Sequence, residues 1–146
     1  MSDVVVTSLN NLQSEVSYGE GRTFITDEPL DAGGDGAGGD PYSLILGALG
    51  SCISMTVRLY ARRKGWPLER VTVRLRQKRM HAQDCKECER STEGYVHHIE
   101  RAVTFEGNLS DEQLERLREI AYKCPVHRTL SSEIVITDLK DPDAAP

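Results

Sequence analysis

The spacing of apolar residues predicts one long helix in the first half of the chain. After Leu44 they recur at three- and four-residue intervals, as on a helix with one buried face. Asp40 followed by Pro41 is typical of a helix start, and Gly65, after a run of basic residues, is typical of a helix end. We therefore expect a helix over residues 41–64. Its predicted apolar stripe comprises Ile45, Ala48, Leu49, Cys52, Met55, Thr56 and Leu59.

Alternating apolar and polar residues predict strands on both sides of this helix. Before it, the β-favouring segments 4–9, 13–18 and 22–26 predict an N-terminal meander. After it, the segments 71–80 and 95–107 alternate as strands with one buried face do. A last strand is expected at residues 133–139, followed by a flexible tail at 141–146.

A second helix is predicted near the end of the chain. Ser110 and Gln113 form a capping box at its start. Pro125 disfavours helical conformation at the preceding residue, so we expect Cys124 at a helix end. The apolar side of this helix is Leu114, Leu117, Ile120, Ala121 and Cys124.

A glycine-rich segment separates the meander from the long helix. Residues 31–40 hold five glycines and three aspartates but no basic residue, Ser or Thr, which a phosphate-binding loop would need. This composition predicts a flexible loop. The chain is then one α+β domain over residues 1–140, made of a meander (1–28), a glycine-rich loop (29–40), a central helix (41–64) and the elements after it.

Composition narrows the functional classes. The net charge of −5 in 146 residues disfavours nucleic-acid binding, which needs a basic surface. The N-terminus lacks the basic and apolar regions of a signal peptide. The most apolar run, residues 44–55, contains glycine and serine and is shorter than the ~20 residues of a membrane span. We therefore expect a cytoplasmic protein, in which four cysteines indicate redox chemistry or metal binding.

Two of these cysteines lie on the predicted apolar stripes. Cys52 and Cys124 are 72 residues apart, and two helices on one sheet can bring their stripes together. They are then either inert buried thiols or a pair that forms a reversible disulfide. Because a thiolate is the nucleophile, a reactive Cys52 needs a nearby cation. The candidates are Arg22, His127 and Arg128, and less favourably Arg58.

Two motifs carry a family resemblance. "DPYSLILGALGSCISMTVRLYARRKGWPLERV", with "EIAYKCPVHRTLSSEI" after it, resembles the OsmC/Ohr family of thiol-dependent hydroperoxide reductases over about residues 41–136. The resemblance implies an intertwined α+β homodimer, in which curved antiparallel sheets wrap long central helices and each active site draws on both chains.

The resemblance also implies a mechanism. Cys52 matches the peroxidatic cysteine and Cys124 the resolving cysteine, while Arg22 matches by position the arginine that holds the thiolate. Family members often carry a Glu after the helix-starting Pro to anchor that arginine, whereas this chain has Tyr42 and Ser43. The implied reaction needs no cofactor. It takes a hydroperoxide as substrate and an external dithiol, of lipoyl or another type, as reductant.

Around the cysteines, Leu49, Met55, His127 and Arg128 are expected to line the pocket or tune the cysteine pair. Apolar residues beside Cys52 favour bulky organic hydroperoxides over hydrogen peroxide. The rival interpretation is a non-enzymatic small-molecule binding module on the same fold, in which Cys52 only packs.

A second cluster lies between the two long strands. His81, Cys85 and Cys88 have a spacing that suits three ligands of Zn²⁺. The alternatives are a second redox-active pair and a plain solvated loop. With zinc bound, the protein would be a zinc-dependent regulator.

Overall fold

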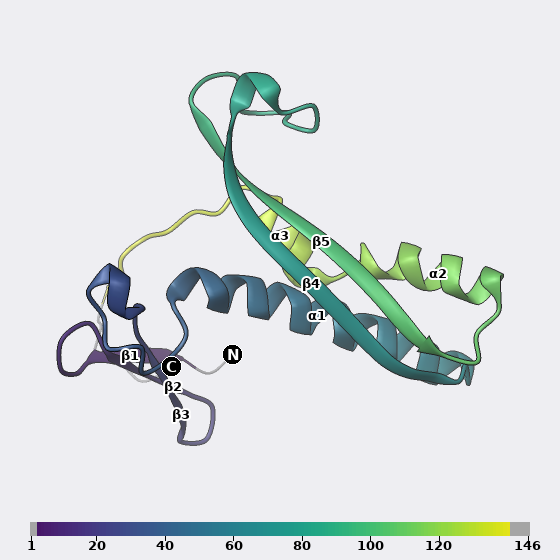
Figure 1. Cartoon of the computed structure of the whole chain (residues 1–146), viewed down its shortest axis with the longest axis horizontal. Helices are drawn as coiled ribbons and strands as arrows, with labels where there is room; N and C mark the ends of the chain where they lie inside the picture. Colours follow the sequence, from purple (N-terminus) through teal and green to yellow (C-terminus); the bar gives the residue numbers. More distant parts are fainter. Residues whose placement is uncertain (1–2, 141–146) are drawn as a thin grey trace. The chain divides into compact units, whose positions relative to one another are not determined.

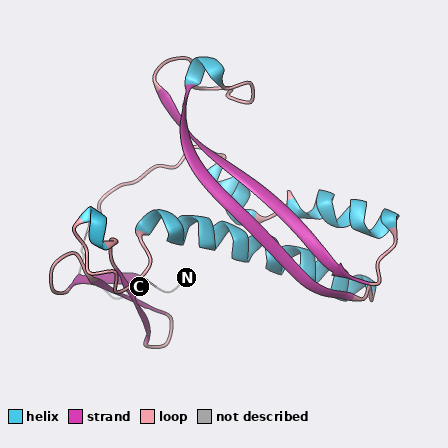
Figure 2. Cartoon of the chain, in the orientation of Figure 1, coloured by secondary structure: helices cyan, strands magenta, loops and turns pink. Residues whose placement is uncertain are grey.

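The computed structural model describes residues 3–140 (Figure 1). Within it the chain forms two compact units, which are described separately. The first contains residues 1–45 and 134–146, of which residues 3–45 and 134–140 are described, and the second contains residues 46–133. Helices and antiparallel strands are combined, as the predicted α+β class requires (Figure 2). A single domain over residues 1–140 stays a prediction.

The first unit contains the expected N-terminal meander. Strands β1 (Val4–Ser8), β2 (Ser14–Tyr18) and β3 (Arg22–Thr26) form an antiparallel sheet in the order β1-β2-β3. Tyr18 pairs with Arg22 across a tight turn that contains two glycines with positive φ. The β-favouring residues therefore located all three strands to within one residue.

The glycine-rich segment makes hydrogen bonds that its composition does not predict, and its flexibility stays a prediction. The buried carboxylate of Asp27 accepts hydrogen bonds from the backbone N–H groups of Glu28, Asp35 and Ala37, at 2.8, 3.0 and 3.0 Å. The bond from Ala37 is the largest cause that holds the pKa of Asp27 below its ordinary value. The segment is therefore wrapped around a carboxylate, an arrangement that glycine composition alone does not reveal.

Glycine is required within this segment by close packing. A Cβ at Gly38 would lie 2.1 Å from the carbonyl oxygen of Ile25, whereas one at Gly39 would lie 3.8 Å from its nearest neighbour, in Leu44. We expect Gly38→Ala to lower the free energy of unfolding by about 1–3 kcal/mol, because a backbone carbonyl must move aside. Chemical denaturation measures this. Gly39→Ala is the matched control, and an equal loss in both variants would contradict the packing argument.

Helix α1 (Pro41–Lys64) has the predicted bounds. The side chain of Asp40 accepts a hydrogen bond from the Ser43 hydroxyl, which is the largest cause that lowers the pKa of Asp40. The backbone N–H groups of Ser43 and Tyr42 lower this pKa further. Asp40 is therefore the N-cap of α1, as predicted from the Asp-Pro pair.

The second unit joins most of α1 to a long hairpin and two further helices. Strand β4 (Leu68–His81) pairs antiparallel with β5 (Tyr95–Gly107), and η2 (Ala82–Asp84) lies in the connection between them. Helix α2 (Asp111–Ala121) begins with the predicted capping box, and α3 (Pro125–Leu130) follows after a short turn. The sequence analysis did not predict α3.

The core of this unit lies between α1, α2 and one face of the hairpin. Its buried residues are Leu49, Ile53, Val57, Ala61, Leu117, Ile120, Ala121 and Cys124. The predicted apolar side of the second helix is confirmed except at Leu114, which is half-buried outside the cluster. The predicted stripe of α1 is wrong in part, because Ile45, Met55 and Leu59 are 42–61% exposed. Helix α1 is apolar on more than one face, so periodicity did not identify the face that the core covers.

Two further expectations change. Among the described residues, α1 is the one helix long and apolar enough to cross a membrane, although we judged its apolar run too short. Core helices of soluble proteins pass the same test, and a buried stripe of α1 packs into the core here.

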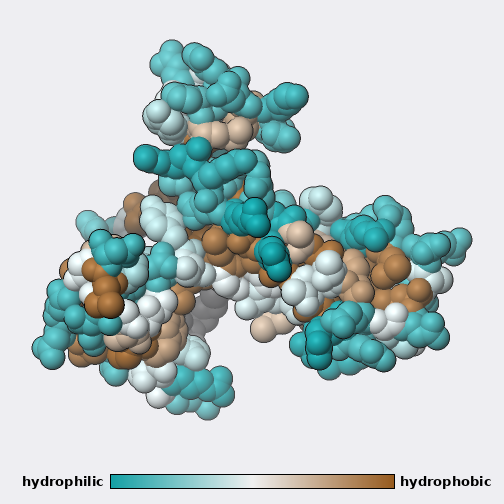
Figure 3. Space-filling model, in the orientation of Figure 1, coloured by the Kyte–Doolittle hydropathy of each residue, from teal (hydrophilic) through white to brown (hydrophobic). Residues whose placement is uncertain are grey.

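Residues 133–139 form no strand, and Ile134, Val135 and Ile136 are exposed. A strand needs a hydrogen-bonded partner, which this segment lacks within the described chain. Figure 3 shows further apolar surface beside the polar outer face of the β4–β5 hairpin.

Candidate active site

Cys52 and Cys124 meet in the core of the second unit. Cys52 lies near the middle of α1, half-buried against the core cluster, and Cys124 is fully buried where α2 has ended and α3 begins. The two thiols are near neighbours, and Cys52 is among the causes that raise the pKa of Cys124. Both thiols are free. The structure therefore brings together the pair that the sequence singled out.

The environment of Cys124 keeps its thiol protonated. Burial is the largest cause that raises the pKa of Cys124, and the neighbouring Cys52 raises it further. The backbone N–H of His127, which donates to the Cys124 sulfur at 3.4 Å, acts in the opposite direction. A protonated Cys124 can donate a hydrogen bond through its S–H group.

Local sequence explains why Cys124 points into the core. Pro125 occupies the first turn of α3, and Cys124, with φ −60° and ψ 128°, is the extended residue that caps it. The sulfur thus receives the N–H that an N-cap side chain normally accepts. A Cys-Pro pair after an amphipathic helix was the signal that could have predicted α3, because Pro favours the first helical position.

Arg101 is a site residue that the sequence analysis missed. It lies on the inward face of β5, between Ile99 and Val103. Its guanidinium donates a hydrogen bond of 2.8 Å to the Ala121 carbonyl and lies 3.9 Å above the Tyr122 ring. Arg101 therefore holds the turn that leads to Cys124. A charged residue on the apolar face of an alternating strand was the available signal.

A cavity of about 460 Å³ lies beside this turn. The pKa of His127 is below its ordinary value, first because the ring is partly buried and second because Arg101 is close. The cavity therefore presents a neutral imidazole at neutral pH. Its lining residues are Leu49, His97, Ile99, Glu100, Arg101, Tyr122, His127, Leu130 and Ser131.

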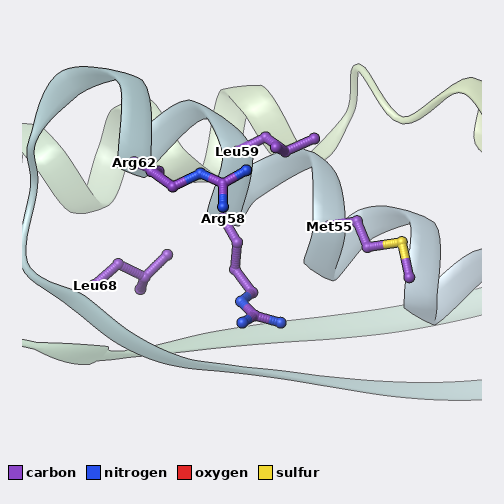
Figure 4. Close-up of a pocket in the computed structure, with 5 residues that line it drawn as sticks. All are labelled: Met55, Arg58, Leu59, Arg62 and Leu68. Carbon is purple, nitrogen blue, oxygen red and sulfur yellow. The ribbon is translucent and has the colours of Figure 1, made fainter.

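The predicted pocket residues are divided between two cavities. Leu49 and His127 line the cavity beside Cys124, but Arg128 does not and is exposed. Met55 lines a different cavity of about 480 Å³ between α1 and β4, drawn in Figure 4. The other residues that line this second cavity are Arg58, Leu59, Arg62 and Leu68.

Arg22 belongs to the first unit, where it is the exposed first residue of β3. Close to Tyr42 and Ser43 in the sequence, the carboxylate of Asp40 accepts a hydrogen bond from Ser43 at the start of α1. Within the described residues no ion pair of Arg22 is formed. Its contact with Cys52 stays a prediction.

The predicted zinc ligands are not assembled. Cys85 and Cys88 form a disulfide, and the His81 ring stacks on Tyr95 with 4.3 Å between the ring centroids. Across residues 3–140, no group of three or more His, Cys, Asp or Glu side chains is arranged to hold a metal ion. The spacing of the three residues suited zinc, but the two sulfurs are bonded to each other.

The lowered pKa of His127 leads to a pH prediction. In the unfolded chain the ring binds a proton below about pH 6.5, and in the folded chain only at lower pH. The unfolded state therefore binds more protons as the pH falls below 6.5, and stability falls. We expect denaturation curves between pH 7 and pH 5 to show a smaller loss for His127→Gln than for wild type.

Arg101 supplies the control for this titration. Arg101→Met should raise the pKa of His127 toward 6.5, measured by NMR, because a nearby positive charge is lost. Arg101→Lys keeps the charge and should leave most of the effect in place. Equal His127 titrations in all three proteins would contradict the assigned cause.

The fold and the cysteine pair define a class of protein: an α+β domain whose helices hold two thiols in contact. The family model described as OsmC-like protein matches residues 33–137. This chain belongs to the OsmC-like protein family.

Solved structures share the fold of this chain. An OsmC-like protein from Mycoplasma pneumoniae is 16% identical, with a TM-score of 0.68 over 90% of this chain and 87% of that one. An organic hydroperoxide resistance protein OsmC from Legionella pneumophila is 17% identical, with a TM-score of 0.61 over 89% and 90%. The organic hydroperoxide resistance protein OhrB of Bacillus subtilis is 17% identical, with a TM-score of 0.56 over 87% and 89%. No curated protein sequence matches the chain.

Proposed function

We propose that this protein is a thiol-dependent peroxidase that reduces organic hydroperoxides to alcohols. The observation that carries the proposal is the contact between Cys52 and Cys124 in the core. Membership of a family whose structural relatives are named organic hydroperoxide resistance proteins supports it.

Cys52 is the proposed nucleophile. Its thiolate attacks the terminal oxygen of ROOH, the O–O bond breaks, and RO⁻ leaves and takes up a proton to give ROH. Cys52 is then a sulfenic acid. The protonated Cys124 suits this step, because its S–H can donate to the Cys52 thiolate before the attack.

Cys124 is the proposed resolving residue. Its sulfur attacks the Cys52 sulfur, an S–S bond forms, and the hydroxyl leaves with the Cys124 proton as water. An external dithiol then reduces the disulfide by thiol–disulfide exchange and is itself oxidised. The closeness of the two side chains in one core supports this step.

Further parts of the proposal depend on assembly. Arg22 would stabilise the thiolate at an active site built from two chains of a homodimer. The exposed apolar residues of α1, among them Met55 and Leu59, support this, because a second chain would cover them. The apolar surroundings of Cys52 support a bulky organic substrate. A cytoplasmic location supplies the reducing dithiols that the cycle needs.

A single-turnover experiment tests the function. Reduced protein is mixed with one equivalent of cumene hydroperoxide, and cumyl alcohol and the disulfide-linked peptides are quantified by mass spectrometry. We expect one alcohol per chain and a Cys52–Cys124 disulfide. Absence of both products would overturn the peroxidase and leave the non-enzymatic binding module.

Metal analysis tests the zinc-dependent regulator. The disulfide between Cys85 and Cys88 removes the two thiolates that such a site needs. We expect purified protein to contain less than about half a zinc ion per chain, since a structural site would be filled nearly stoichiometrically.

A further inference from the structure

The second cysteine pair lies at the far end of the hairpin from the first. The Cys85–Cys88 disulfide lies in the connection between β4 and β5, in residues 82–94 at the tip of the hairpin in Figure 1. The chain therefore holds its cysteines as two pairs, one with free thiols in the core and one oxidised at the hairpin tip.

This disulfide is not needed to hold the hairpin. The strand ladder continues to its last pair, His81 with Tyr95, and the N–H of Ala82 donates to the Gly94 carbonyl just beyond it. The Tyr95 ring is also flanked by His81 and by Arg79, whose guanidinium lies 5.5 Å from the ring centroid. The two ends of the loop are therefore already fixed.

The disulfide also constrains very little chain. It joins residues only three apart in sequence and connects no two helices or strands. A cross-link restricts the unfolded state more as the enclosed loop grows, so a loop this short contributes the least. A stabilising role therefore does not explain the bond.

The pair is open to solvent-borne thiols. Cys85 and Cys88 are only partly buried, and their neighbours Lys86, Glu87 and Glu89 are exposed. Exchange requires a thiolate to reach one sulfur of the disulfide, and access here is from solvent.

The pair is too far from the core cysteines to exchange with them in one chain. The part of α1 around Gly50 packs on Leu75 of β4. From Leu75 to His81 the extended strand covers about 20 Å, and the disulfide lies beyond. Within one chain the two pairs therefore exchange electrons separately.

We propose that Cys85 and Cys88 form a second thiol–disulfide exchange site, whose substrate is an external dithiol. A thiolate of the dithiol attacks one sulfur, the Cys85–Cys88 bond breaks, and the departing cysteine sulfur takes up a proton. The second thiol of the dithiol then attacks the mixed disulfide and releases the other cysteine. The pair gains two electrons and two protons, and the dithiol becomes a disulfide. This inference does not rest on the proposed peroxidase.

Two complementary variants test it. Cys52→Ser/Cys124→Ser retains only the hairpin pair, and Cys85→Ser/Cys88→Ser retains only the core pair. Each folded protein is incubated with dithiothreitol as the dithiol probe, quenched with acid, alkylated and analysed by mass spectrometry. In the first variant we expect two new alkyl groups, formed at a rate within about tenfold of the rate in denaturant, because the bond is accessible. Oxidised dithiothreitol should restore the disulfide, and the melting temperature should be the same in both states.

Three outcomes would overturn the exchange site. They are a bond that is reduced only after unfolding, a pair that stays as free thiols in excess oxidised dithiothreitol, and a melting temperature that falls on reduction. The last result identifies a structural cross-link. The second variant separates this inference from the proposed function, since it should still convert cumene hydroperoxide to alcohol whatever happens at the hairpin.

Discussion

Cys52→Ser is expected to lower the rate of cumene hydroperoxide consumption, with excess dithiol, by at least about 1,000-fold, because a serine hydroxyl cannot replace a thiolate nucleophile. The side chains are nearly equal in size, and Cys52 is only half-buried, so the variant should fold. Peroxide loss is followed colorimetrically and the fold by circular dichroism. A folded variant with wild-type activity would remove Cys52 from the mechanism.

Cys124→Ser tests the proposed resolving step. The first equivalent of peroxide should still be reduced, because Cys52 is retained, but no disulfide can form inside the chain. Mass spectrometry should detect Cys52 as a sulfenic acid or a more oxidised product. An unmodified Cys52 thiol after peroxide treatment would count against the resolving role of Cys124.

Leu117→Ala is expected to lower the free energy of unfolding by about 2–5 kcal/mol, because the leucine is fully buried and a cavity would remain. Leu117 belongs to the cluster that includes Ile53 of α1 and Cys124. Loss of packing there should also loosen the contact between the two cysteines. Urea denaturation measures the stability, and the rate of disulfide formation after peroxide treatment measures the contact.

Leu30→Ala is the matched control for this substitution. Leu30 is 77% exposed, so the same change should alter stability by no more than about 0.5 kcal/mol. If Leu30→Ala destabilised the chain as much as Leu117→Ala, burial in the second unit would not be the source of the effect.

Local patterns predicted much of this structure. The Asp-Pro pair and the terminal glycine placed α1, and the capping box placed α2. β-favouring residues placed the meander, and alternation placed β4 and β5, because each of these signals acts within a few residues. The contact of Cys52 with Cys124 was also foreseeable, since both thiols lay on apolar stripes.

The remaining features depend on partners distant in sequence. Asp27 orders a glycine segment through N–H groups up to ten residues away, and Arg101 reaches a carbonyl twenty residues away. Residues 133–139 alternate like a strand but have no partner to pair with in the described chain. Periodicity indicates the secondary structure that a segment favours by itself. These features depend instead on the residues that the folded chain places next to the segment.

In the proposed cycle, the closeness of the two cysteines also affects the competition between disulfide formation and irreversible oxidation of Cys52. A sulfenic acid at Cys52 is consumed either by a second peroxide, in a step that speeds up with peroxide concentration, or by Cys124, in a step that does not. Because Cys124 is already in contact, its attack has the advantage of a preassembled intramolecular reaction. If the proposed cycle is correct, the protein should therefore survive peroxide concentrations that irreversibly oxidise proteins in which the resolving thiol must first move toward the sulfenic acid.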